Sequence, residues 1–545
     1  MFVPLHVKSD YSLGYGTASL DELVERAAAL GYRSLALTDL ENLYGQVRFH
    51  YLCRQHGIQP ITGVELRPGF DGRRCPGTRA GRLVLLAADQ TGYRNLCRIV
   101  SRRRGGMPGS GAAGFSDPVA VAELHSEGLF ALSDDPAVVD RLLYGGLFTT
   151  ERLGLLVVRP EAAIPGQGDG ERFSRVQGKG VRVIADLDPV FLQQSDRALH
   201  VLQLAVAQGR LMEEVARGVE AEGKDRWFRP PAEAEALFTD LPEALAAAAE
   251  IAASCRFELG EAEGTAHAFD PEAGARDTMQ LRDRCRKALA GVQLPGKEDG
   301  RRYEVRLEEE LAVFDELHFS GFMLMVADIL THCRGKGIPV AVRGSAVSSL
   351  VLHLLGGSPV DPLVHGLLFE RFLHRGKSAW PDVDIDLPWD RRDEVIGWVY
   401  ERFGADRVAM IAAYHTFRHR SALRDGLKAW GAPDALIESM SRAIPADDLE
   451  VEAVDFLDLA RGAGGTDLLQ TAAPESGGNG TGKAGGARKA KGVAPELEKA
   501  LTLIRRLVGR PRHVAVHPGG IVIDWRPLDQ VLPLELAPKG VVITQ

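Results

Sequence analysis

The segment Asp382-Val383-Asp384-Ile385-Asp386 sets three carboxylates at alternate positions, with β-branched residues between them. Side chains of an extended strand alternate between two faces, so the aspartates share one face and the apolar residues share the other. Carboxylates this close repel one another unless cations lie among them, and such oxygen ligands suit Mg²⁺. Two neighbouring ions of this kind are typical of enzymes that transfer phosphoryl or nucleotidyl groups. The alternative, a solvent-facing acidic edge strand, suits the surrounding apolar-rich segment less well.

A second motif lies upstream at Arg343-Gly344-Ser345, between a short apolar run and residues 346–355, which favour a helix. Unpaired N–H groups at such a turn and helix start attract anions, so a triphosphate fits there. Gly344 lets the backbone approach the phosphates, and Ser345 adds a hydroxyl donor. A Gly-Ser turn alone is equally typical of an ordinary helix cap. Followed by the carboxylate strand, it predicts nucleotidyl transfer, and we expect the turn to face the aspartates across a central sheet.

These motifs resemble, in order and spacing, the palm of the bacterial C-family replicative polymerase, the alpha subunit of DNA polymerase III. The matching palm segments are residues 344–346, 360–363, 367–373 and 381–386. Residues 342–349, 511–513 and 517–523 are more similar to the error-prone branch of the family than to its housekeeping branch. The resemblance runs from residue 2 to the last residue.

The resemblance implies a polymerase beta-like nucleotidyltransferase palm with an inserted helical thumb. The implied activity is Mg²⁺-dependent, DNA-directed DNA synthesis from a primer 3′-hydroxyl, in replication or lesion-tolerant repair. Two Mg²⁺ ions would be bound by the catalytic Asp384 and Asp386, and the nucleotide by Gly344, Ser345 and Arg371. The implied partners are primer–template DNA, deoxynucleoside triphosphates and other replication or repair subunits, in the cytoplasm and away from membranes.

The resemblance also implies a third catalytic carboxylate, on a strand that would follow residues 541–545, where this sequence stops. The fingers, the sliding-clamp site and a nucleic-acid-binding module would follow as well. The chain is therefore expected to be truncated before the third aspartate and not to extend a primer by itself. The alternative function is that of a catalytically incomplete fragment, either a binding or assembly module or one half of a split polymerase.

The first 265 residues alternate strand-like apolar runs with helical stretches, which is typical of an α/β layer or barrel. They resemble the polymerase-and-histidinol-phosphatase (PHP) domain, a distorted (β/α)₇ barrel whose active members bind metal ions. Lys8, Leu40 and Val190 stand at three of that family's ligand positions. The ammonium of Lys8 carries the same sign of charge as a metal ion and opposes its binding. We therefore expect no metal in this domain and a structural role for it. The remnants of the site are His6, Asp39, Glu65, Asp188 and His200.

The net charge of −9 means that a DNA-handling protein of this composition must concentrate its basic groups locally. Arg420, Arg424 and Lys428 do so at i, i+4 and i+8 on one face of an expected helix, beside Arg418 and His419. We interpret this ridge as a contact for DNA or triphosphate phosphates, and a solvated helix face is the alternative. No apolar run approaches the roughly 18 residues of a membrane span. The 6 scattered cysteines indicate reduced thiols.

The 545 residues are enough for roughly three to four domains. We expect a multidomain α/β protein with a PHP-like barrel at 1–265, a connector at 266–300, the first part of the palm at 301–430, a helical thumb at 431–510, and the second, incomplete part of the palm at 511–545, in short strands. Within the thumb, residues 462–492 are rich in Gly, Ala, Ser and Lys and are expected to be disordered.

Overall fold

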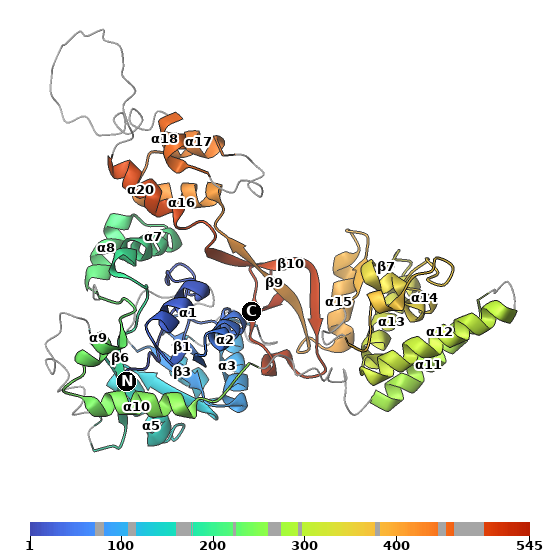
Figure 1. The fold of residues 1–545 in the computed structure, drawn as a ribbon, viewed down its shortest axis with the longest axis horizontal. Coiled ribbons are helices and arrows are strands. Elements are labelled where there is room, and N and C mark those ends of the chain that lie inside the picture. Colours follow the sequence, from blue (N-terminus) through green and yellow to red (C-terminus); the bar gives the residue numbers. More distant parts are fainter. Residues whose placement is uncertain are drawn as a thin grey trace, which may run out of the picture. The chain divides into compact units, whose positions relative to one another are not determined.

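The computed structural model describes residues 1–70, 81–106, 116–159, 176, 178–221, 225–259, 274–292, 297–376, 382–444, 454–462 and 495–545. These residues form two compact units, whose elements are labelled in Figure 1. Unit 1 comprises Met1–Glu258, Met410–Gly520 and Asp529–Gln545. Unit 2 comprises Leu259–Ala409 and Ile521–Leu528.

Unit 1 contains a mixed six-stranded sheet with the order β1-β2-β3-β4-β5-β6. The strands are β1 (Ser34–Leu37), β2 (Gln59–Leu66), β3 (Leu83–Ala87), β4 (Leu129–Ser133), β5 (Leu153–Val158) and β6 (Arg182–Asp186). β3 is antiparallel to both of its neighbours, and the other pairs are parallel. Both faces of this sheet are covered by other parts of the chain. For this reason β3 and β4 are buried throughout and are mostly apolar, instead of alternating between apolar and polar residues. Where the sequence predicts a (β/α)₇ barrel, the described residues form a curled half-barrel of six strands.

Helices from the first 258 residues of the chain surround this sheet. They are α1 (Leu20–Ala29), α2 (Gln46–Gln55), α3 (Gln90–Arg103), α4 (Pro118–Ala122), α5 (Pro136–Tyr144), α9 (Pro231–Ala236) and α10 (Pro242–Ser254). α1 begins at a capping box, in which Ser19 Oγ accepts from the Glu22 amide and the Glu22 carboxylate accepts from the Ser19 amide. Its apolar residues recur with the helical period and are buried against the sheet.

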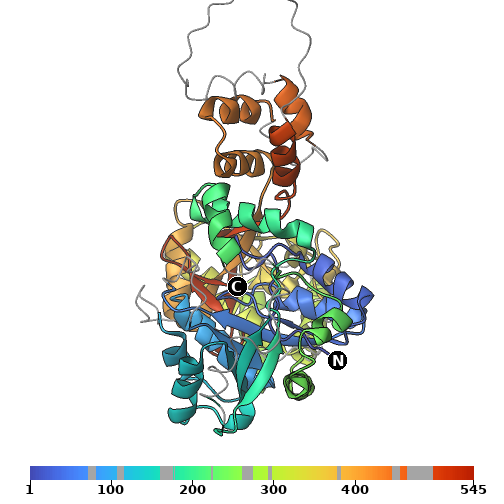
Figure 2. The same ribbon diagram turned by 90° about the vertical axis from the view of Figure 1, so that its left-hand side faces the viewer.

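A second group of helices in unit 1 joins two distant parts of the sequence. These helices are α7 (Arg197–Gln208), α8 (Met212–Ala221), α16 (His419–Trp430), α17 (Asp434–Arg442), α18 (Phe456–Gly462) and α20 (Pro495–Arg505). Leu202, Leu427 and Leu501, one from each of α7, α16 and α20, lie in one buried apolar cluster. In Figure 2 the orange and red helices stack on the green α7 and α8. The predicted helices of 431–510 are therefore present in the described residues; most of the 462–492 tract lies outside them.

A four-stranded sheet has the order β10-β9-β12-β11. Its strands are β9 (Val408–Thr416), β10 (Pro511–Ile523), β11 (Leu534–Leu536) and β12 (Val542–Thr544). The prediction of short strands after residue 510 is right for β11 and β12 and wrong for the 13-residue β10. The Leu534 amide donates to Ser101 Oγ (2.9 Å), and Arg104 Nη1 lies 3.0 Å from Glu535 Oε2. β11 is thereby fixed to the end of α3.

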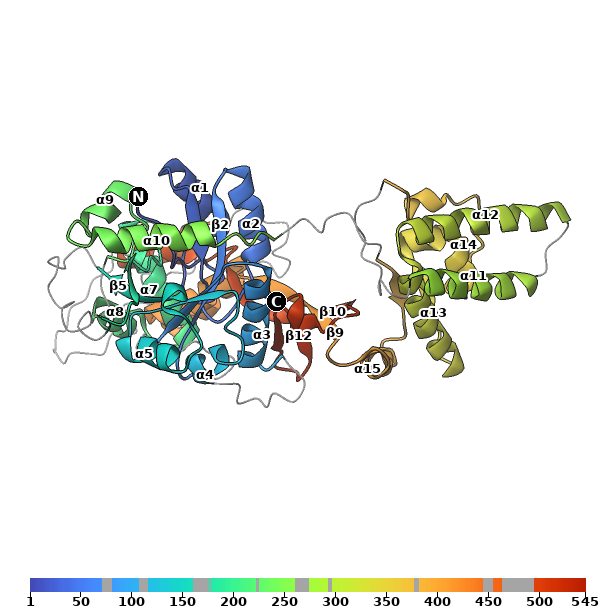
Figure 3. The ribbon, with the colours of Figure 1, turned by 90° about the horizontal axis from the view of Figure 1, so that it is seen from below.

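Unit 2 is built from helices around a small two-stranded sheet. Its helices are α11 (Gly274–Ala290), α12 (Lys297–Glu316), α13 (Ser320–Gly335), α14 (Leu350–Leu354) and α15 (Arg392–Phe403). The strands are β7 (Ala341–Arg343) and β8 (Asp384–Asp386), and the 3₁₀ turns η3 (Gly344–Ser348) and η4 (Phe369–Arg371) belong to the same unit. In Figure 3, α11 and α12 lie side by side. The described part of the predicted connector is thus helical, with Leu281 and Cys285 in the core of unit 2.

The compact units divide the chain at other places than the predicted domains. Residues 410–430 and most of 511–545 cluster with the N-terminal region, because β11 and the helices after β9 pack against it. The domain boundaries stay a prediction. In the described ranges, no helix combines the length and the apolar composition needed to cross a bilayer. Five of the cysteines lie in these ranges, and all five are buried free thiols.

Candidate functional site

The two sequence motifs meet in the antiparallel pair of β7 and β8. Arg343 is paired with Asp384, and Ala341 with Asp386. The side chains of Asp384 and Asp386 are 53% and 64% exposed, whereas Ile385 between them packs against the core of unit 2. The predicted alternation therefore holds: both carboxylates project from one face of the strand, away from the core.

The Gly344 turn lies directly beside the carboxylates. Gly344 has a φ of +71°, which only glycine adopts readily, and a Cβ atom built on it would lie 3.8 Å from Asp384 Oδ2. Ser345 follows at the start of η3. The turn thus directly follows β7, the strand that pairs with the aspartate strand β8 in a two-stranded sheet. The expectation that the turn and the aspartates face one another across a central sheet is wrong.

Arg343 supplies a cation that sequence reasoning missed. Its Nε lies 3.1 Å from Asp386 Oδ1, and its Nη2 lies 3.7 Å from Asp384 Oδ2. The guanidinium therefore relieves the repulsion between the two carboxylates. All three side chains are more than half exposed, so this arrangement stabilises the fold by no more than about 1 kcal/mol. The strand pairing brings Arg343 to the aspartates. In the sequence, its position next to Gly344 was the only hint that Arg343 lies near the site.

Glu310 on α12 is a second residue that sequence reasoning missed. Its buried carboxylate accepts hydrogen bonds from Ser349 Oγ (2.8 Å) and from the amides of Leu350 (2.9 Å) and Val351 (3.1 Å). Arg306 Nε donates to it over 2.7 Å. Burial raises the pKa of Glu310, while these hydrogen bonds oppose the rise. Glu310 thus takes up the amides at the start of α14, which leaves the turn at Gly344 and Ser345 as the predicted phosphate site.

Arg371 is exposed at the end of η4, the turn that packs against η3. Phe369 and Phe372 anchor this segment in the core of unit 2. The fold thus brings the predicted nucleotide-binding arginine onto the segment next to the Gly344 turn. The structure places these residues in one region of unit 2, and their roles stay predictions.

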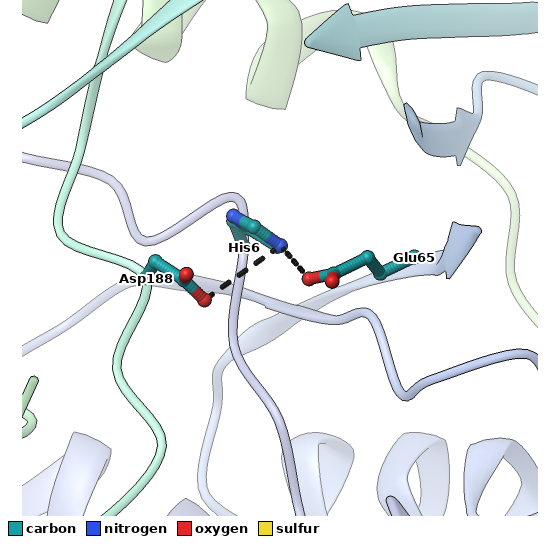
Figure 4. A group of neighbouring side chains, drawn as sticks. All are labelled: His6, Glu65 and Asp188. Carbon is teal, nitrogen blue, oxygen red and sulfur yellow. Dashed lines mark hydrogen bonds and ion pairs between the residues drawn. The ribbon is translucent and has the colours of Figure 1, made fainter. Parts of the chain in front are cut away.

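In unit 1, three of the predicted remnants form a buried cluster, drawn in Figure 4. His6 Nε2 lies 2.6 Å from Glu65 Oε2 and 3.8 Å from Asp188 Oδ1, and His6 Nδ1 lies 2.8 Å from Asp186 Oδ2. One atom from each of His6, Glu65 and Asp188 lies within 4.8 Å of the others, a spacing that could surround a metal ion.

Protein cations already occupy this cluster. Lys8 Nζ lies 2.7 Å from Glu65 Oε2 and 2.9 Å from His6 Nε2, and it also contacts Asp188. Arg67 Nε lies 2.6 Å from Glu65 Oε1, and Arg226 Nη2 lies 2.7 Å from Asp188 Oδ2. Burial by itself would raise the pKa of Glu65, but Arg67 and Lys8 hold it well below its usual value. The carboxylates of Glu65 and Asp188 are already paired with an ammonium and with guanidinium groups. The cluster therefore does not fit a metal ion.

The other remnants lie outside this cluster. Asp39 accepts from the Ser9 amide (2.8 Å) and from Ser12 Oγ (2.6 Å), and burial raises its pKa. His200 Nδ1 lies 2.6 Å from the Tyr15 carbonyl oxygen, and burial lowers the pKa of His200 to about 3, so it is neutral and donates to that carbonyl. Leu40 and Val190 lie in one small apolar cluster instead of ligating anything.

The predicted basic ridge lies on α16, beside a hollow of about 490 Å³. Arg424 and Lys428 line it and are exposed. Arg420 also lines it, but its Nη2 donates to the Ile444 carbonyl over 2.6 Å, which ties it to the end of the neighbouring helical segment. Arg420 therefore has a structural partner that the spacing alone did not reveal.

Two family models match this chain. Residues 279–545 match the bacterial DNA polymerase III alpha NTPase domain, and residues 4–151 match the PHP domain. The chain thus carries a bacterial DNA polymerase III alpha domain together with a PHP domain. The first match contains Gly344, Asp384 and Asp386, and the second contains His6, Lys8 and Glu65.

Curated relatives carry both names that the sequence suggests. DNA polymerase III subunit alpha of Bacillus subtilis (strain 168) is 31% identical over 567 residues, covering 100% of this chain and 46% of the relative. The error-prone DNA polymerase of Anaeromyxobacter dehalogenans (strain 2CP-C) is 31% identical over 625 residues, covering 98% of this chain and 52% of the relative. The chain spans about half the length of the relatives it matches. Both names match at the same identity, so the error-prone branch stays a prediction.

The solved structure of an amidohydrolase from Chromobacterium violaceum matches this chain at 16% sequence identity and a TM-score of 0.24. The match covers 34% of this chain and 86% of the amidohydrolase chain. That score is too low to support an argument.

Proposed function

We propose that this chain provides the catalytic aspartates and the nucleotide-binding turn of a DNA-directed DNA polymerase. The observation that carries the proposal is the pair Asp384 and Asp386, exposed on one face of β8 and adjoining Gly344 within the polymerase family match. In this proposal, β7, β8 and their surroundings form part of the palm, α17, α18 and α20 belong to the thumb, and the PHP domain is structural. Primer–template DNA, deoxynucleoside triphosphates and a cytoplasmic location belong to the same proposal.

The proposed reaction joins the primer 3′-oxygen to the α-phosphorus of a deoxynucleoside triphosphate. The bond from that phosphorus to the bridging oxygen breaks, pyrophosphate leaves, and the hydroxyl proton passes to water. Asp384 and Asp386 would hold two Mg²⁺ ions, which when bound neutralise charge on the phosphates and acidify the 3′-hydroxyl. The amides of the Gly344–Ser345 turn would donate to phosphate oxygens. Arg371 would offset the negative charge of the triphosphate.

The alternative, a binding or assembly module, predicts that Mg²⁺ and a nucleotide do not bind together at the β7–β8 pair. Cooperative binding of metal and nucleotide therefore separates the two functions.

The test measures binding of a fluorescent deoxynucleoside triphosphate to the chain, with and without Mg²⁺. We expect Mg²⁺-dependent binding that Gly344→Ala weakens, because alanine at a φ of +71° strains the turn whose amides would donate to the phosphates. Gly337→Ala is the matched control, since Gly337 has a φ of +64° in the same unit and an open surrounding. Binding that is independent of Mg²⁺, or equal in the two variants, would overturn the assignment.

A further inference from the structure

Trp389 is an exposed tryptophan that follows the aspartate strand β8 by three residues. At 88%, its exposed fraction is the largest among the exposed large hydrophobic residues of the described ranges. Trp398, on the next helix α15, is by contrast half-buried and stacks on the ring of His332, with centroids 4.2 Å apart. An indole is a large apolar surface that proteins normally bury. Trp389 instead presents a flat apolar face to the solvent.

The backbone on either side of Trp389 is anchored. On one side, Leu387 packs against the small apolar cluster that contains Val395 of α15. On the other side, the Arg391 amide donates to the Pro388 carbonyl over 3.0 Å, which closes a turn around Trp389. Because this turn is already ordered, a ligand that binds to the indole has little backbone entropy to remove.

The turn lies close to the proposed metal and phosphate site. Three residues of extended chain span no more than about 11 Å, so the Cα atom of Trp389 lies within that distance of the Cα atom of Asp386. Gly344 adjoins the same pair of aspartates through Asp384. A nucleoside triphosphate whose phosphates lie at these residues carries its base at the far end of the sugar, a comparable length away. The indole is therefore within reach of the base.

The charges around this indole disfavour an anionic ligand. Arg391 Nε lies 2.8 Å from Glu394 Oε2. Arg392 Nη2 lies 3.1 Å from Asp393 Oδ1, so both neighbouring cations already have a carboxylate. Asp390 is exposed and adds a negative charge beside the ring. A backbone phosphate or an acidic peptide is repelled by that carboxylate, whereas a nucleobase is uncharged and offers a flat π face.

A protein-docking surface fits these observations less well. Such surfaces are contiguous apolar patches. Residues 390–394, which follow Trp389, are all charged, and Leu387 before it packs into the unit. Within residues 382–394, Trp389 is the one large hydrophobic residue that is exposed. A single flat ring on an anchored turn suits stacking on another flat ring.

We propose that Trp389 stacks on the base of the deoxynucleoside triphosphate bound at the aspartate site. The inference rests on the proposed function, which assigns the phosphates and the metal ions but leaves the base without a partner. Stacking on an aromatic side chain accepts every base, because every base has a π face. Purines offer the larger ring surface, so Trp389 should favour dATP over dCTP.

The experiment compares Mg²⁺-dependent binding of dATP with that of inorganic tripolyphosphate, which has no base, by titration calorimetry. We expect Trp389→Ala to weaken dATP binding about ten-fold and to leave tripolyphosphate binding unchanged. Trp389→Phe keeps an aromatic ring and should retain most of the dATP affinity. Trp525→Ala is the control, because Trp525 is a 37% exposed tryptophan of the same unit, and it should change neither affinity.

Indole fluorescence gives a second readout, since a stacked base quenches it. Addition of Mg²⁺ and dATP should quench the emission of the unchanged chain more than that of Trp389→Phe, and tripolyphosphate should quench neither. Equal quenching of the two proteins by dATP would overturn the stacking.

The outcomes separate this inference from the proposed function. If Trp389→Ala weakens both ligands equally, the residue supports the fold of the site and the stacking is wrong. If it weakens neither, the stacking is wrong and the aspartate site stands. If it weakens binding of a labelled oligonucleotide and not of dATP, the base belongs to a nucleic-acid strand and the nucleotide assignment is wrong. If the unchanged chain binds neither ligand, the aspartate site is wrong and the stacking with it.

Discussion

Arg343 Nε lies 3.1 Å from Asp386 Oδ1, in a hydrogen-bonding position next to the carboxylate that we assign to metal binding. Nη2 of the same guanidinium lies 3.7 Å from Asp384 Oδ2. A side-chain cation thus lies where the family's metal ions are expected. Divalent metal ions must compete with this guanidinium for the two carboxylates.

Arg343→Gln should therefore tighten the binding of Mn²⁺ in the absence of nucleotide. The expected change is about 1.4- to five-fold, because exposed ion pairs contribute roughly 0.2–1 kcal/mol. Arg343→Lys keeps the charge and serves as the control. Weaker metal binding by Arg343→Gln would mean that the guanidinium orients the carboxylates instead of competing with the metal. A titration followed by electron paramagnetic resonance measures both variants.

Glu310→Ala should destabilise unit 2 by about 3–5 kcal/mol, since it leaves Arg306 unpaired and the amides of Leu350 and Val351 without an acceptor. Glu309→Ala, one position earlier on α12 and exposed, should change the free energy of unfolding by less than about 0.5 kcal/mol. Urea denaturation measures both. Equal effects of the two substitutions would show that Glu310 does not anchor the start of α14.

Lys8→Met should destabilise unit 1 by about 3 kcal/mol, because Glu65 and Asp188 lose the ammonium between them. The arginines around the cluster prevent a larger loss. Lys179→Met removes a half-buried lysine that pairs with Asp140 and should have a much smaller effect. Elemental analysis should find no zinc or manganese bound at the cluster of the unchanged chain. Stoichiometric metal that Glu65→Gln removes would reverse our interpretation of this domain.

Asp10 gives unit 1 a pH dependence. Burial raises its pKa to about 7, although Arg510 opposes the rise. The folded state then holds a proton that the unfolded state has already released, so stability falls as pH rises from about 4 to about 7. Asp10→Asn removes this penalty, so relative to the unchanged chain its free energy of unfolding should increase between pH 5 and pH 8. Destabilisation by Asp10→Asn at pH 8 would show that the ion pair with Arg510 outweighs burial.

Local patterns were sufficient for the predictions that turned out right. The alternation of Asp384 and Asp386 follows from the strand period, whereas the absence of a metal ion beside Lys8 stays a prediction. The partners of these residues depend on tertiary packing. The position of Arg343 next to Gly344 does not by itself reveal its pairing with β8, and no local signal links Glu310 to the amides of α14. Likewise, the apolar faces of α7 and α16 predict burial without indicating that they share one core.

The most direct test of the central claim is Mn²⁺ binding in the presence of a deoxynucleoside triphosphate, followed by electron paramagnetic resonance. We predict protein-bound Mn²⁺ in the unchanged chain and in Asp382→Asn, whose exposed carboxylate precedes β8, and its loss in Asp384→Asn/Asp386→Asn. Mn²⁺ binding that survives the double substitution, or that never forms in the unchanged chain, would contradict the assignment of these two aspartates as the metal site.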